Sequence, residues 1–334
     1  MKTIKKFLSP KTTLRSIKNR VILKKLYTND FNNFYHSFSL DDSKSNIEQL
    51  EAKLLFFAHS LEKGLSHGNF RAGFGIGVLN NLAESISIYN QKEFDRTKEK
   101  YQIALSALKH YQKFHEEKNY SIEFFKKIFS NDILTEIAAA DLDLSGVKIV
   151  SNCEKITNKK KNFEELALGR TSIREFDSTP VSNEKVCHAI QIALKTPSVC
   201  NRQPARVYQV TNQEKIEELL KVQGGYNGYP LPPVLLLVTA SNTSFIYLVE
   251  RNEGFIDGGL FSMSLLYGLE YEGLAACALN AMLTIEKEKE IRRILELPKE
   301  ENLIMFIAVG NIPQLIKSPK SHRVSIESVL TKIQ

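Results

Sequence analysis

The hydrophobic pattern of this chain changes character near residue 160. From Ile47 to about Ala140, Leu, Phe and Tyr recur every three or four residues among Lys and Glu, without a clear strand. Such spacing predicts amphipathic helices. Beyond residue 163, short apolar runs bounded by Pro, Gly or Asn alternate with helical patterns. A chain of 334 residues with this change is expected to form two folding units, one helical and one α+β.

The extents of the expected elements follow from the same periodicities. In the first half, helices are predicted at residues 47–62, 76–90, 93–117 and 121–140. In the second half, strands are predicted at residues 206–211, 233–240, 276–281 and 303–309. Ser182 is a candidate N-cap for a helix through Lys195. The run Gly254–Tyr271 predicts a helix that is apolar on most faces, and such a helix lies centrally or at a subunit contact.

These patterns also give expected domain boundaries. The polar stretch NCEKITNKKKN separates the two halves and is typical of a linker. The expected boundaries are 1–45 for a basic N-terminal segment, 46–151 for a helical domain, 152–162 for the linker and 163–334 for the α+β domain.

Positive charge is concentrated at the start of the chain. The formal net charge is +7, and every charged residue before Asp30 is Lys or Arg. Residues 14–26 place apolar side chains at near-helical spacing between these basic residues. Two interpretations stay open: a solvated basic helix that covers part of a neighbouring domain, or a helix that contacts an anionic membrane surface peripherally. Nucleic-acid binding is not expected, because the charge is confined to one end and no reading motif accompanies it.

Cysteine spacing and hydropathy exclude several other classes. The four cysteines show no C-x-x-C or Cys/His ligand spacing, so neither a metal site nor a disulfide framework is predicted. No apolar run reaches the ~18 residues that a membrane span needs. The opening lacks an apolar segment followed by a small-residue cleavage site. We therefore expect a reduced, cytoplasmic protein, associated with membranes at most through its basic N-terminus.

A glycine-rich segment, HSLEKGLSHGNFRAGFGIG, interrupts the helical pattern from His59 to Gly77. It is not a dinucleotide fingerprint, because it lacks a preceding strand and the G-x-G-x-x-G spacing. It is either a structural turn with satisfied polar groups or a loop that contacts a substrate. In the second case, His67 and Arg71 are the candidate contacts.

Two polar segments lie near the start of the α+β part. RTSIREFDSTPVS sets Arg170, Ser172 and Arg174 on alternate positions ahead of a predicted helix. TPSVCNRQPARVYQV begins at Thr196 and sets small polar side chains ahead of a predicted strand. These are Ser198, Asn201, Arg202 and Gln203. Hydroxyl, amide and guanidinium groups at element ends suit a ligand with a phosphate at one end and a hydrogen-bonding ring at the other.

The two segments resemble the FMN-dependent nitroreductase superfamily, whose members carry Arg-x-Ser-x-Arg-x-Phe and then Pro-Ser-x-x-Asn-x-Gln-Pro. Two further segments agree and follow in family order. Residues 254–280 resemble the long central helix and the strand entry beside the flavin, and AVGNIPQLIKSPKSHRVSIESV resembles the terminal strand and the basic phosphate segment. The resemblance covers roughly residues 163–334. It implies an α+β fold with a nitroreductase-like mixed sheet flanked by helices, to which the all-helical N-terminal domain is an addition.

The resemblance also implies which residues bind FMN. Arg170 and Arg323 would bind the phosphate, since guanidinium can hold it bidentately. The segment reads PKSHR where relatives have Lys-x-Arg, so the second cation is either Lys320 or His322. Arg174 would lie near the flavin pyrimidine, where a fixed cation stabilises the negative charge of the reduced ring.

In relatives, the second polar segment reaches the flavin bound by the other chain, which implies a homodimer. The main chain of the strand entry would face the flavin ring. The full expected set for FMN is Arg170, Thr171, Ser172, Arg174, Pro197, Ser198, Asn201, Gln203, Cys277, Ala278, Leu279, Asn280, Lys320 and Arg323.

The activity implied is ping-pong hydride transfer from NADH or NADPH, through flavin N5, to an organic acceptor such as a quinone, a nitroaromatic or a dedicated metabolite. No catalytic side chain is expected, since the flavin carries the chemistry. Cys200 lacks the His or Asp context that a nucleophile needs. Two alternatives stay open: a flavin-dependent dehydrogenase of a specific small molecule, and a redox-inactive binding module whose N-terminal domain contacts a membrane or a protein.

Overall fold

The structure, a computed structural model, describes residues 10–38 and 44–333. It divides into two compact units, and each contains segments that are far apart in the sequence. The sheet unit comprises residues 10–38, 156–170 and 176–311. The helical unit comprises residues 44–155, 171–175 and 312–333.

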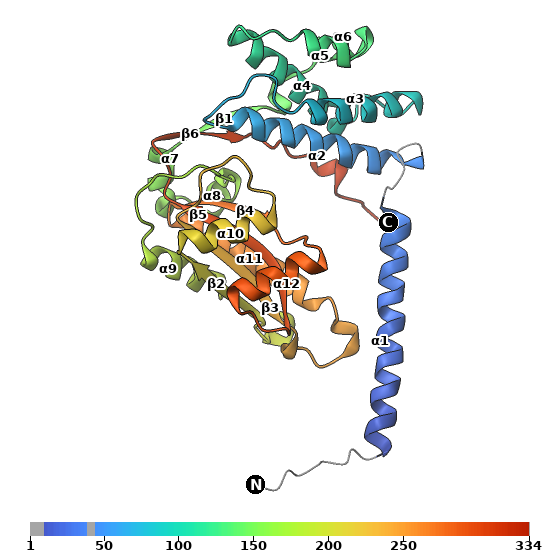
Figure 1. Cartoon of the computed structure of the whole chain (residues 1–334), viewed down its shortest axis with the longest axis vertical. Helices are drawn as coiled ribbons and strands as arrows, with labels where there is room; N and C mark the ends of the chain where they lie inside the picture. Colours follow the sequence, from blue (N-terminus) through green and yellow to red (C-terminus); the bar gives the residue numbers. More distant parts are fainter. Residues whose placement is uncertain (1–9, 39–43, 334) are drawn as a thin grey trace. The chain divides into compact units, whose positions relative to one another are not determined.

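The sheet unit is built on four antiparallel strands in the order β2-β3-β5-β4 (Figure 1). They are β2 (Ala205–Val210), β3 (Val234–Ser241), β4 (Ala275–Asn280) and β5 (Glu301–Gly310). All four predicted strands are confirmed, and their ends shift by at most two residues. The α+β class is confirmed as well, but the expectation of a mixed sheet is wrong for these four strands, because each neighbouring pair is antiparallel.

Helices cover both faces of this sheet. They are α9 (Asn183–Ala193), α10 (Gln213–Gln223), α11 (Glu253–Tyr271) and α12 (Ile285–Leu295). Leu235 and Leu237 of β3 face the core that contains α10 and α12, whereas Leu236 and Val238 face the core that contains α9 and α11. Successive side chains of a strand point to opposite faces, and β3 is buried throughout. This is why its sequence is a continuous apolar run.

The predicted helix at 254–271 is α11, and it packs closely on α9. A methyl group on Gly268 would lie 2.6 Å from the backbone oxygen of Ala189. Only a glycine therefore permits this approach. Some apolar side chains of α11 nevertheless stay exposed, namely Phe255, Ile256 and Leu260.

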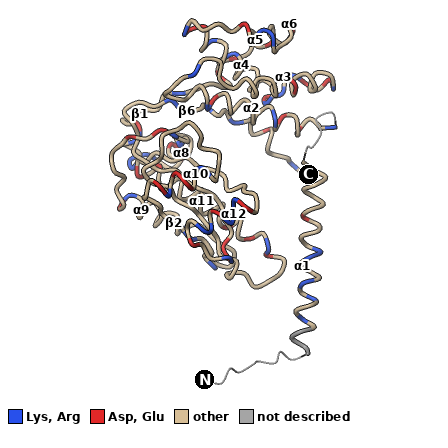
Figure 2. The backbone as a smooth tube through the Cα atoms, in the orientation of Figure 1, with Lys and Arg blue, Asp and Glu red and all other residues tan. Residues whose placement is uncertain are grey.

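The long helix α1 (Pro10–Ser37) belongs to the sheet unit. Near its end, Asp30 accepts hydrogen bonds from Arg251 at 2.6 and 2.8 Å and from Asn252 at 3.1 Å. Its apolar side chains Leu14 and Ile17 are more than half exposed, at 68% and 55%. Basic residues recur along the helix (Figure 2). None of the helices within the described residues combines the length and apolar character that crossing a membrane requires.

The helical unit contains the predicted helices of the first half. They are α2 (Ile47–Ser66), α3 (Ile76–Gln91), α4 (Glu99–Glu117), α5 (Glu123–Ile128) and α6 (Asn131–Ala139). The single helix predicted at 121–140 is wrong. The backbone becomes extended at Phe129 and Ser130, and Ser130 stands at the N-cap position of α6. The prediction at 93–117 begins too early, because residues 92–98 form turns.

Its core combines leucines with buried tyrosines whose hydroxyl groups are all hydrogen-bonded. Tyr89 donates to the backbone oxygen of Asp95 at 2.8 Å. Tyr101 donates to Glu136 at 2.9 Å, and Tyr111 donates to the backbone oxygen of Phe74 at 2.8 Å. Burial raises the pKa of Tyr89 to about 12.

A two-stranded antiparallel sheet joins the end of the chain to this unit. It pairs β1 (Val147–Ser151) with β6 (Leu315–Pro319), and Val147 lies opposite Pro319. The periodicities did not predict β1. The stretch expected as a linker contains two short helical elements, α7 (Asn152–Ile156) and a 3₁₀ turn at Asn158–Lys160, and α8 (Phe163–Gly169) begins just after it.

Candidate functional site

The first polar motif begins where α8 ends. Arg170 stands at the C-cap position of α8, and its amide donates to the Leu166 oxygen at 3.1 Å. In the helical unit, Ser318 of β6 donates to the backbone oxygen of Ser172 at 2.9 Å. Its hydroxyl also lies 3.3 Å from that of Thr171. The structure therefore brings part of this motif beside the strand that leads into the terminal basic segment.

The other end of this motif adjoins the part of the glycine-rich segment that follows α2, residues 67–75, which we call the glycine-rich loop; the earlier part, from His59 to Ser66, continues α2. The Gly68 amide donates to Glu175 at 2.9 Å, and Nδ1 of His67 lies 3.8 Å from the same carboxylate. Burial lowers the pKa of His67, and Arg71 and Arg174 lower it further, against the opposing effect of Glu175. His67 and Arg71, the candidate substrate contacts, are thus electrostatic neighbours of Arg174.

The glycine-rich loop is supported from the core of the helical unit. Nε2 of the fully buried His115 accepts a hydrogen bond from the Gly73 amide at 3.0 Å. Its Nδ1 lies 2.8 Å from the backbone oxygen of Tyr111. Burial lowers the pKa of His115. The neutral imidazole that burial favours is the form that this arrangement requires, because a protonated Nε2 could not accept from Gly73.

The terminal basic segment follows β6 within the helical unit. The Lys320 amide donates to the Gly146 oxygen at 2.8 Å, and its ammonium group lies 3.4 Å from Asp143. Ser321 adopts a φ of 48°, in the left-handed region. Arg323 is exposed, and its Nη1 donates to the Ser321 oxygen. Of these two cations, Lys320 is ion-paired with a carboxylate, while Arg323 is exposed and donates to a backbone oxygen.

The second polar motif is a loop with unusual backbone geometry. Cys200, Asn201 and Gln203 have φ values of 49°, 56° and 51°, which non-glycine residues seldom adopt. Such residues cost roughly 1–3 kcal/mol each and concentrate at functional sites. Ser198 stabilises the loop, since its hydroxyl accepts from the Gln203 amide at 2.9 Å. The loop thereby displays the exposed amide side chains of Asn201 and Gln203.

A small cavity lies beneath this loop, against α11. Its volume is about 150 Å³, and Thr196, Pro197 and Phe261 contribute to its lining. The buried Asp257 of α11 accepts a hydrogen bond from the Val199 amide at 3.2 Å and so fixes the loop to the helix. The hydroxyl of Thr196 is buried and has no hydrogen-bond partner. An unsatisfied buried hydroxyl beside a cavity is a donor available to a ligand.

Arg202, in the same loop, already has a carboxylate partner. It contacts Glu250 through both terminal nitrogens. Its hydrogen bonds, with one from the Tyr247 amide, lower the pKa of Glu250 to about 2. Arg202 therefore supports the loop and is not counted among the cations for a phosphate.

The strand entry expected beside a flavin is β4, which forms one edge of the four-stranded sheet. Cys277 and Leu279 are buried, whereas Ala278 and Asn280 are exposed. One side of β4 pairs with β5, so main-chain groups on its other side remain outside this ladder. Such groups can serve as hydrogen-bond donors to a planar ligand.

The side chains described above include the kinds of polar group that FMN requires. Arg323 offers an exposed guanidinium for a phosphate. Asn201 and Gln203 offer amides, and Thr196 offers a hydroxyl without a partner. By contrast, no group of three or more His, Cys, Asp or Glu side chains in residues 10–38 and 44–333 is arranged to bind a metal ion.

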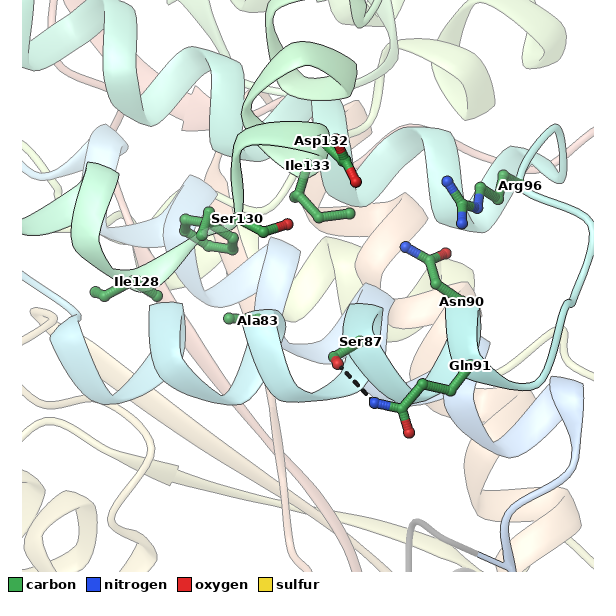
Figure 3. A pocket seen from close by; sticks show the side chains of 10 residues that line it. Ala83, Ser87, Asn90, Gln91, Arg96, Ile128, Ser130, Asp132 and Ile133 are labelled. Carbon is green, nitrogen blue, oxygen red and sulfur yellow. Dashed lines mark hydrogen bonds between the residues drawn. The ribbon is translucent and has the colours of Figure 1, made fainter.

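A larger cavity, of about 460 Å³, lies within the helical unit (Figure 3). Ser87, Asn90 and Gln91 line it from α3, and Asp132 lines it from α6. Within α3, the side-chain amide of Gln91 donates to the Ser87 hydroxyl at 3.1 Å. The sequence does not predict this group of residues, because they follow no motif spacing and come together only in the folded helical unit.

Comparison with known proteins agrees with the first two motifs. The family model described as Nitroreductase family matches residues 167–225. A solved nitroreductase family protein of Clostridium difficile 630 is 24% identical and covers 51% of this chain and 98% of its own, with a TM-score of 0.43. A solved FMN-dependent nitroreductase of Clostridium difficile R20291 is 16% identical and covers 50% of this chain and 94% of its own, with a TM-score of 0.41. No curated protein matches this chain. The segment that carries both polar motifs thus matches the nitroreductase family, which confirms the resemblance seen in the sequence.

Proposed function

We propose that this chain is an FMN-dependent oxidoreductase of the nitroreductase type. The observation that carries the proposal is the family match over residues 167–225, since this segment includes both polar motifs. The strained loop at Cys200–Gln203 adds support from a different direction, because backbone strain of this kind is retained where it serves a site.

The proposed phosphate ligands are Arg170 and Arg323, two guanidinium groups that can each hold a phosphate bidentately. Thr171 and Ser172 would supply donors near the phosphate and ribityl chain. Arg174 would stabilise negative charge at the pyrimidine edge. The contact of Lys320 with Asp143 is weak enough, as an exposed pair, for Lys320 to turn to a phosphate instead, and His322 is the alternative cation.

The second motif is proposed to act in a homodimer, with Pro197, Ser198, Asn201 and Gln203 of one copy serving the flavin of the other. The exposed apolar side chains of α11 support a subunit contact, since Phe255, Ile256 and Leu260 form part of an otherwise buried helix. The main chain at residues 277–280 of β4 would face the ring. The side chains of Cys277 and Leu279 then have a packing role.

When bound, FMN would supply hydride transfer from NADH or NADPH to an organic acceptor by a ping-pong route. The chain itself would bind and orient FMN and tune its reduction potential, and no side chain is proposed as a general acid. His67 and Arg71 are proposed to contact the acceptor. The lowered pKa of His67 makes it a neutral hydrogen-bonding group near pH 7.

The test is spectroscopic and chemical. Protein purified from bacteria should be yellow, and the flavin released by denaturation should co-migrate with FMN in chromatography. Stopped-flow mixing should then show bleaching by NADH or NADPH and recovery on adding a quinone or a nitroaromatic. Bleaching by a small metabolite but by neither nicotinamide would identify a specific dehydrogenase instead. Colourless protein that cannot be reconstituted would leave only a redox-inactive module.

A peripheral membrane contact through α1 is proposed in addition. Its exposed apolar side chains Leu14, Ile17 and Val21 alternate with basic residues, a composition suited to anionic lipid surfaces. Liposome sedimentation should show that the full chain binds phosphatidylserine vesicles and that a chain beginning at Ser45 does not. Equal sedimentation of the two would overturn this proposal.

A further inference from the structure

The terminal basic segment is held by a buried carboxylate of the helical unit. Glu62, on α2, is only 3% exposed. It accepts a hydrogen bond from the Ser321 amide at 3.2 Å and from the Ser145 hydroxyl at 2.9 Å. His59 contacts both Glu62 and Ser321. Its Nδ1 lies 3.2 Å from the Glu62 carboxylate and 3.3 Å from the Ser321 hydroxyl. These bonds fix Ser321 in its left-handed conformation.

A second carboxylate holds the segment on the other side of Arg323. Glu99, in the first turn of α4, accepts from the Ser325 amide at 2.8 Å and from the Ser328 hydroxyl at 3.1 Å. The Ser325 amide bond is the main reason why the pKa of Glu99 is lowered, and His322 contributes through its charge. Arg323 therefore lies between two anchored residues, Ser321 and Ser325.

The helical unit also holds the part of the first motif that lies beside this segment. Ser318 connects β6 to the Ser172 backbone, and Gly68 holds Glu175. Gly68 is itself constrained, because a methyl group there would lie 2.9 Å from the Glu175 carboxylate. Two segments that carry proposed flavin ligands thus contact residues of the first half of the chain, which the nitroreductase resemblance does not cover.

We propose that Glu62 and Glu99 are positioning residues that hold the 320–325 segment so that Arg323 meets the FMN phosphate. The added helical domain then holds one of the proposed phosphate ligands in place. This inference rests on the proposed function. It assigns to the first half of the chain a role in cofactor retention.

The experiment compares full-length wild type with Glu62→Gln and Glu99→Ala. Glu62→Gln keeps the shape of a buried side chain, and Glu99→Ala alters a partly exposed position. Glu84→Gln, at an exposed position of α3, is the matched control. Each protein is freed of flavin and titrated with FMN and with riboflavin, which lacks the phosphate. Amide exchange of residues 320–328 is measured in parallel.

We expect Glu62→Gln and Glu99→Ala each to weaken FMN binding about tenfold, the effect of ~1.4 kcal/mol, while riboflavin binding and the control stay unchanged. Exchange at 320–328 should become faster. In an Arg323→Ala background, Glu99→Ala should cause little further loss, because the two residues act through one contact.

Equal losses for FMN and riboflavin, or full additivity with Arg323→Ala, would overturn the positioning role. So would wild-type FMN affinity in both carboxylate variants. A wild type that binds neither ligand would instead overturn the proposed function, and this inference with it. The wild-type titration therefore separates the two failures.

Discussion

The cores of the two units differ in chemistry. The difference shows which core side chains only pack and which also hold a neighbouring loop. The cores on both faces of the sheet are mainly aliphatic, with β3 as their buried centre, although this unit also buries hydrogen-bonded carboxylates such as Asp257 and Glu301. The helical unit instead buries Tyr89, Tyr101, Tyr111 and His115, all of them hydrogen-bonded. In the helical unit, two of these polar groups reach outward and hold the glycine-rich loop. Both units combine close packing with buried hydrogen bonds, but in the helical unit these bonds come from aromatic core side chains that also hold a loop.

The largest loss of stability is expected from a substitution in the sheet unit. Gly268→Ala places a methyl group 2.6 Å from the Ala189 oxygen, so α9 and α11 must separate. We expect a loss of about 1–3 kcal/mol in the free energy of unfolding, measured by urea denaturation. On the same helix, Gly259→Ala meets nothing within 4 Å and should be neutral or stabilising by up to about 1 kcal/mol. If both variants behave alike, the close approach of the helices does not matter.

A smaller effect is expected in the helical unit. Tyr111→Phe removes the hydroxyl that donates to Phe74 but keeps the ring. The cost should be about 1–2 kcal/mol, since a partly buried carbonyl loses its donor, and proteolysis should cut the glycine-rich loop faster. Tyr120→Phe, at an exposed position of the same unit, is the control. Unchanged proteolysis in Tyr111→Phe would show that the loop does not depend on this bond.

The smallest effect is a pH dependence specific to the helical unit. Because the pKa of His115 is lowered in the folded protein, the unfolded chain takes up a proton first as pH falls below about 6.5. The free energy of unfolding should therefore decrease between about pH 7 and pH 5.5. Carboxylates with lowered pKa, such as Glu250, lose their contribution only at lower pH.

The free energy of unfolding at each pH can be measured by urea denaturation. Tyrosine fluorescence is the signal, since the chain has no Trp. His115→Gln should flatten the slope of stability against pH over that window. An equally steep slope in the variant would place the titration elsewhere, for instance at His67, whose pKa is also lowered.

The same contrast explains what the sequence could predict. The strands of the sheet unit are apolar or β-branched runs between turn residues, so their positions follow from local pattern. The strand β1 has only five residues and pairs with β6 near the other end of the chain, so no local signal marks it. Likewise, the break at Phe129–Ser130 reflects packing that periodicity does not record.

For the candidate site, residue types were predictable and their supports were not. Arg170, Ser172 and Asn201 lie in motifs with recognisable spacing. Glu62 and Glu99 are single acidic residues on helices rich in charge, and nothing in the sequence separates them from solvated neighbours. Only the hydrogen bonds to Ser321 and Ser325 distinguish them.

The most direct test of the central proposal is FMN affinity after both arginines are removed. Each charged phosphate contact contributes roughly 1.5–3 kcal/mol, so the variant with Arg170→Ala and Arg323→Ala should bind FMN at least ~2 kcal/mol more weakly than wild type, while riboflavin binding changes little. If the double variant holds FMN as tightly as wild type, the phosphate does not lie where the two motifs would put it, and the proposed flavin site is wrong.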